Sequence, residues 1–207
     1  MNNWKGYFRT PQLWLNILFN IYILFEYRND PDGIRSVIML FWWQSVCLGM
    51  SNFVQMLALK DFSPVEVNGE MKGPSWSLKI SMALFFAIHF GGFHLVYGVF
   101  ILVSKSIPGS MLGNAHNTFL TAMLLFAAMI AQLPYEISDN AKRKMDIMKM
   151  FFTPYLRIIP MHLVILGGAF LSHRFSVFYL FMLLKFLVDI ITDLLYAYRK
   201  QHWHPAD

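Results

Sequence analysis

Ionisable and imidazole side chains interrupt three long apolar stretches, and these are the residues most able to do chemistry: Lys185, Asp189 and Asp193; His89, His94 and Tyr97; and Arg157 and His162. Imidazole and carboxylate together suit zinc, iron or copper. We therefore name His89, His162 and Asp189 as candidate metal ligands or proton-relay groups, with Lys185 tuning the carboxylate. An open position on such a metal would allow redox chemistry.

A structural interpretation stands beside the chemical one. Lys185 and Asp189 are four residues apart, so on a helix they share a face and form an ion pair that lets both charges be buried. A single His on an apolar helix usually hydrogen-bonds to a neighbouring helix. The amides of Gln44 and Asn52 fit the same packing role.

The estimated depths of these residues in the membrane would allow them to form one cluster. At about 1.5 Å rise per residue, Lys185 and His89 fall near the middle of their stretches, and Asp189, His162 and Asn52 lie toward one end. His94 is about 140° around the helix from His89, so it shares a face more nearly with Tyr97. The cluster is expected to face inward, because charges are costly in lipid.

Sequence signatures of common catalytic sites are absent. The chain has no His-Glu-x-x-His pair, nucleophile elbow, phosphate loop or selectivity filter. The catalytic residues of any enzymatic activity are therefore unknown.

The composition of the chain indicates what kind of secondary structure must position these residues. The 207 residues are 57% hydrophobic and only 14% charged, against roughly 45–50% and about 25% in soluble domains. A small globule has too little interior to hide so much apolar surface. Composition thus excludes a soluble enzyme and a disordered chain, and a single cysteine excludes a disulfide scaffold.

The apolar stretches predict an all-α fold, an integral membrane bundle of about six transmembrane helices in one domain over residues 1–207. About 20 apolar residues are needed for each crossing. The predicted spans are Gln12–Tyr27, Ile34–Leu59, Trp76–Val103, Asn117–Leu133, Arg157–Leu171 and Phe175–Tyr198. The first is weakened by Asn16 and Asn20, and the fifth by Pro160. The glycine pair Gly91-Gly92 is expected to allow close helix contact.

The loops predict a cell-membrane protein with both termini in the cytoplasm, because basic residues concentrate on that side. The cytoplasmic set is Lys5, Arg9, Lys60, Lys72, Lys142, Arg143, Lys144, Lys149, Arg199 and Lys200; the outer set is Arg28, Arg35, Lys105 and Arg174. Anionic headgroups account for the net charge of +5 without nucleic acid. The expected partners are the lipid bilayer and either membrane partner subunits or further copies of the chain.

Several motifs resemble a prokaryotic multi-spanning family catalogued only as a domain of unknown function. They are Phe41-Trp-Trp-Gln-Ser-Val, Asn52-Phe-Val-Gln-Met-Leu, His89-Phe-Gly, Pro154-Tyr-Leu-Arg-Ile, His162-Leu-Val-Ile-Leu-Gly-Gly and Lys185-Phe-Leu-Val-Asp. The resemblance runs from the second predicted span to the end of the chain. The family tends to carry Glu where this chain has Gln44 and a second His where it has Tyr97, and both departures weaken a metal or relay role. The resemblance implies a fold and a set of positions, and no activity.

Two functional hypotheses follow. In the first, the His/Lys/Asp cluster binds a metal ion or relays protons, in transport or redox chemistry. In the second, the chain is a non-catalytic membrane scaffold or accessory subunit whose buried polar residues only fix helix packing.

Overall fold

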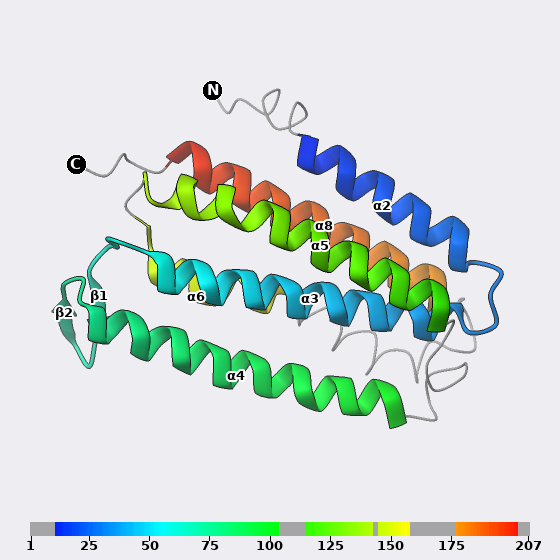
Figure 1. Cartoon of the computed structure of the whole chain (residues 1–207), viewed down its shortest axis with the longest axis horizontal. Helices are drawn as coiled ribbons and strands as arrows, with labels where there is room; N and C mark the ends of the chain where they lie inside the picture. Colours follow the sequence, from blue (N-terminus) through cyan, green and yellow to red (C-terminus); the bar gives the residue numbers. More distant parts are fainter. Residues whose placement is uncertain (1–10, 104–114, 143–144, 158–176, 203–207) are drawn as a thin grey trace. The chain divides into compact units, whose positions relative to one another are not determined.

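The computed structural model describes residues 11–103, 115–142, 145–157 and 177–202, and most of them are helical (Figure 1). The helices are α2 (Pro11–Tyr27), α3 (Gly33–Ala58), α4 (Trp76–Val103), α5 (Ala115–Asn140), α6 (Ile147–Phe152) and α8 (Val177–His202). Two short strands, β1 (Val65–Val67) and β2 (Glu70–Lys72), and a 3-10 turn, η1 (Thr153–Arg157), complete the described elements. The predicted helical fold is therefore confirmed for this part of the chain.

The helix bounds follow the apolar stretches closely, with one informative exception. α4 begins and ends at the predicted residues, whereas α5 continues seven residues beyond the predicted end at Leu133 and contains Pro134. Proline removes one backbone donor, and neighbouring groups can satisfy the freed carbonyl within a membrane helix. The predicted stretch Arg157–Leu171 lies almost wholly outside the described residues.

Six membrane spans are not supported by the described helices. Three of these helices, α3, α4 and α5, are long and apolar enough to cross a membrane. α2 has 17 residues, fewer than the roughly 20 that a crossing needs. α8 is long enough but carries several charged residues, among them Lys185 and Asp189. Among the described residues, length and composition therefore support three of the predicted spans, and the fifth predicted span lies outside them.

The chain divides into two compact units, and the first contains α2, the start of α3 up to Phe41, and α8. Its core includes Ile23, Phe41 and Phe181, and the last two rings meet edge to face at 5.6 Å. Arg35, expected in an outer loop, is buried and donates from Nη1 to the carbonyl oxygen of Ile101 at 2.6 Å. A cation at this position complements the negative end of the helix dipole of α4.

In the second unit, aromatic rings of α3 and α4 fit against glycines of the facing helix. The two helices lie side by side in Figure 1. The indole of Trp42 donates to the carbonyl oxygen of His94 at 2.8 Å and covers Gly98, where an added Cβ would lie 2.8 Å from the ring. Phe90 covers Gly49 in the same way. The prediction for Gly91-Gly92 is wrong for the described residues, among which an added Cβ at either position would meet nothing within 4 Å.

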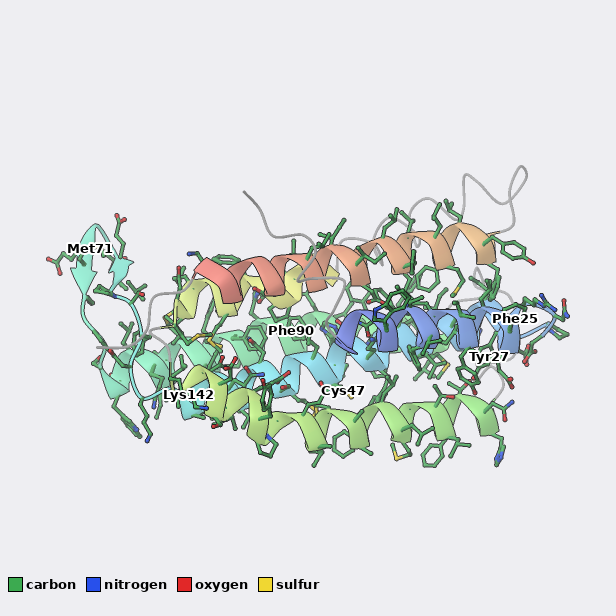
Figure 2. All side chains as sticks on the ribbon, turned by 90° about the horizontal axis from the view of Figure 1, so that it is seen from above. Phe25, Tyr27, Cys47, Met71, Phe90 and Lys142 are labelled. Atoms are coloured by element: carbon green, nitrogen blue, oxygen red, sulfur yellow. The ribbon has the colours of Figure 1, made fainter. Side chains whose placement is uncertain are left out.

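A β-hairpin connects α3 to α4 in this unit. β1 and β2 are antiparallel, with Val67 opposite Glu70. The turn residues Asn68 and Gly69 have φ values of 55° and 81°, which matches the primed turn that Asn-Gly favours. Met71 stands at the end of this hairpin, away from the helices, and is 67% exposed (Figure 2).

Candidate functional site

The strongest charge pair lies within the first unit, on α8. Lys185 and Asp189 are one helical turn apart, and Nζ lies 2.7 Å from Oδ2. Their side chains are 0% and 1% exposed. The predicted pairing of these two residues on one helix face is confirmed. Such burial is tolerable only where other groups complete the hydrogen bonding of both charges.

Asn20 of α2 contributes hydrogen bonds to both charges. Its Nδ2 donates to Asp189 Oδ2 at 3.0 Å and to the carbonyl oxygen of Asn16 at 2.8 Å, while its Oδ1 accepts from Lys185 Nζ at 2.9 Å. One neutral amide thus touches both members of the ion pair. We call Asn20, Lys185 and Asp189 the charge clamp, because they join α2 to α8.

Two aromatic rings complete the surroundings of the ammonium group. Lys185 Nζ lies 5.5 Å from the centre of the Phe19 ring and 5.7 Å from that of Phe41. Cations are attracted to ring faces at such distances. The ammonium group therefore has an ion-pair partner, an amide acceptor and two rings around it.

In the second unit, His94 occupies a packing role. Its Nδ1 lies 2.9 Å from the carbonyl oxygen of Phe90, and its Nε2 lies 2.9 Å from Ser45 Oγ. Since a carbonyl can only accept, Nδ1 carries the hydrogen and Nε2 accepts from the serine. The imidazole stacks on Phe90 with ring centres 4.1 Å apart. Both nitrogens of this buried ring are engaged, and Tyr97 is buried on the same helix.

His89 does not face inward as expected, because its side chain is exposed. Its Nδ1 lies 2.7 Å from the hydroxyl of Tyr155, and its ring stacks on Phe85 at 5.5 Å. Burial raises the pKa of Tyr155 above its ordinary value, so the phenol keeps its proton near neutral pH. The hydroxyl can then donate its hydrogen to His89 Nδ1.

The remaining predicted site residues have other surroundings. Asn52 donates to the carbonyl oxygen of Met150 at 3.1 Å, and Gln44 Oε1 is buried without a hydrogen bond from the part of the chain that the structure describes. Arg157 lies in η1, and Asp193 lies in α8. His162 lies outside the described residues.

The predicted metal triad is therefore not tested. Among residues 11–103, 115–142, 145–157 and 177–202, no group of three His, Cys, Asp or Glu side chains could hold a metal ion. His162 is not among them, and His89 and Asp189 belong to different units. Within its own unit, Asp189 Oδ2 is occupied by the ammonium group of Lys185 and the amide of Asn20.

Sequence reasoning missed two polar groups. From the sequence, Asn20 only weakens the prediction that the first apolar stretch spans the membrane. A carboxamide in an apolar stretch nevertheless indicates a polar partner on another helix. Glu136 fell outside the predicted spans because the fourth was ended before Pro134. In the structure Glu136 accepts hydrogen bonds from Ser51 and Gln55 of α3.

Comparison with known protein families assigns nearly the whole chain to one of them. A profile described as a family of unknown function (DUF6498) matches residues 3–205. No curated protein and no solved structure matches the chain. The match agrees with the resemblance to an uncharacterised family, and the prokaryotic and multi-spanning character of that family stays a prediction.

Proposed function

Since the chain belongs to the family of unknown function DUF6498, membership supplies no activity, and we propose a function from the structure itself. The chain is a multi-spanning membrane protein that acts as a non-catalytic scaffold or accessory subunit. Its buried charges fix the packing of its helices. The observation that carries this proposal is the charge clamp, in which one amide of α2 contacts both charges of α8.

The outward faces of the candidate spans support membrane insertion. α4 exposes half or more of several large apolar side chains: Leu84, Phe85, Ile88, Leu95 and Val96. α5 exposes Phe119, Leu120 and Leu124 in the same way. Apolar faces of this extent mark a surface for lipid or for another membrane helix.

The proposed setting is the cell membrane, with both termini in the cytoplasm. The excess of basic residues on that side supports this orientation. The partners are the bilayer and either other membrane subunits or further copies of this chain. An accessory subunit needs an exposed surface that binds the subunit it supports.

A clamp of this kind fixes which helices pair and in which register. Apolar burial gives little driving force for helix association in lipid, so polar contacts between helices carry specificity. Every described contact of the Asn20 amide is made within the clamp or with its own helix. These contacts hold the ammonium and the carboxylate in place, which fits a packing role better than a ligand-binding role.

The test is the stability of Asn20→Ala, measured by thermal or denaturant unfolding in nanodiscs. The variant loses hydrogen bonds to two charged groups, and we expect a loss of about 2–3 kcal/mol. Leu18→Ala is the matched control, since Leu18 lies on the same helix and is 60% exposed. Equal stability of the two variants would contradict the packing role.

Metal binding or proton relay through His89, His162 and Asp189 is the second candidate, with zinc, iron or copper as the metal. It is favoured by His89, which is exposed and uses only Nδ1 in its hydrogen bond to Tyr155. Elemental analysis of the purified protein separates the candidates. A stoichiometric metal that disappears in both His89→Ala and His162→Ala supports this role, and a metal-free protein counts against the metal version.

A further inference from the structure

A second polar cluster lies within the second unit, between two candidate membrane spans. Glu136 is one turn from the end of α5, and Ser51 and Gln55 are one turn apart on α3. Ser51 Oγ and Gln55 Nε2 lie 3.1 Å and 2.6 Å from the same carboxylate oxygen, Oε2. Gln55 is itself oriented by Asn140, which donates from Nδ2 to Gln55 Oε1 at 2.7 Å.

The groups that contact Glu136 are all neutral. Its described contacts are the hydroxyl of Ser51 and the amide of Gln55, and neither titrates near neutral pH. Lys79, in the first turn of α4, donates instead to the carbonyl oxygen of Leu59 at 2.8 Å. The nearest acidic residue on α5, Asp139, follows Glu136 by three residues. In the described part of the chain, Glu136 therefore has no cation to offset its charge.

The two carboxylate oxygens differ in their surroundings. Oε2 accepts both hydrogen bonds, whereas Oε1 accepts none from the described residues. Glu136 is only partly buried. Oε1 is therefore the oxygen left to accept a proton, while Oε2 stays anchored to α3.

α3 carries a further polar residue, Gln44, on the same helix face as the two residues that contact Glu136. Gln44, Ser51 and Gln55 are spaced by seven and four residues, which places them on one helix face. Gln44 Oε1 is a buried acceptor to which no described residue donates a hydrogen bond. An acceptor left in this state favours a bound water or another proton-bearing group beside it.

We propose that Glu136 is a proton-binding site of this protein. The carboxylate takes a proton from hydronium onto Oε1 and leaves water, which removes a negative charge that no described cation offsets. Ser51 and Gln55 hold the carboxyl group in one orientation in both states. This site is separate from the charge clamp, so it does not depend on the packing role proposed above.

The test uses dicyclohexylcarbodiimide, a lipid-soluble reagent that adds to a protonated carboxyl group. The full-length protein in nanodiscs is treated across the neutral pH range, and peptide mass mapping locates the adduct. We expect modification at Glu136 that decreases as pH rises, because only the protonated acid reacts. Glu136→Gln keeps the size and a carbonyl acceptor, and we expect it to lose the adduct. Glu66 of the exposed hairpin is the internal control, and we expect little adduct there.

If Glu136→Gln disturbs folding, a second variant, Gln55→Leu, still tests the proposal. Gln55→Leu removes one donor to the charged form, so the protonated fraction and the adduct yield at a given pH should rise. Absence of modification at Glu136 at every pH would overturn the proposal, and so would a fall in yield in Gln55→Leu. Protection by sodium chloride at constant pH, with choline chloride giving none, would also overturn it and assign the site to sodium.

Discussion

Asn20 shows how one neutral residue makes a buried ion pair tolerable. Its amide presents an acceptor to Lys185 and a donor to Asp189 at the same time. The spacing of Lys185 and Asp189 was enough to predict their pairing, because a helix fixes which residues are one turn apart. The partner from α2 could not be predicted, because the contact spans 165 residues of sequence. Sequence spacing specifies contacts within a helix and leaves contacts between helices open.

The residue-scale prediction concerns Tyr155 and alkaline pH. Folding raises the pKa of this phenol by burial. Its contribution to stability is therefore present below the ordinary phenol pKa of about 10 and is lost as pH rises through the higher folded value. In unfolding measurements at rising pH, wild type should lose more stability than Tyr155→Phe does once the pH exceeds the ordinary phenol pKa. Parallel curves for the two proteins would contradict a buried phenol.

At the scale of elements, the packing of α3 on α4 depends on rings lying over glycines. Trp42 covers Gly98, and Phe90 covers Gly49. Apolar runs predicted the bounds of both helices, since length and hydropathy are local properties. Which glycines lie at the contact depends on the rotation of each helix, and α4 is apolar on nearly every side. This is why Gly91-Gly92 was chosen wrongly from the sequence.

The element-scale prediction compares alanine substitutions of these glycines. Gly98→Ala places a Cβ 2.8 Å from the indole of Trp42, and we expect a loss of about 1–3 kcal/mol from overpacking. Gly91→Ala meets nothing within 4 Å and should gain up to about 1 kcal/mol from helix propensity. Unfolding in the same nanodiscs measures both. Similar effects of the two substitutions would contradict the ring-on-glycine contact.

For the whole molecule, composition predicted a helical membrane protein, and the described residues agree in their helices and in three candidate spans. The prediction of about six crossings is not supported by the described residues, which contain three candidate spans. A window of apolar residues does not distinguish a membrane span from a helix buried against other helices, and α8 buries Lys185 and Asp189. The role of Glu136 was missed for a related reason, since the continuation of α5 through Pro134 depends on its neighbours.

The whole-molecule prediction tests orientation with single cysteines in a Cys47→Ser background, which removes the only native thiol. Gly73→Cys follows the hairpin, and the exposed Asn29→Cys follows α2. A membrane-impermeant maleimide should label the former only in inside-out vesicles and the latter only in right-side-out vesicles. Labelling of both positions from one side would contradict the proposed topology.

The most direct test of the packing role compares three clamp variants in one unfolding experiment. Asp189→Ala and Lys185→Met each leave an uncompensated buried charge, and we expect each to lose about 3–5 kcal/mol. The double variant Lys185→Met/Asp189→Leu removes both charges together and should regain most of that loss. A double variant as unstable as the single variants combined would show that the two charges do not act as a buried pair, and would contradict the account.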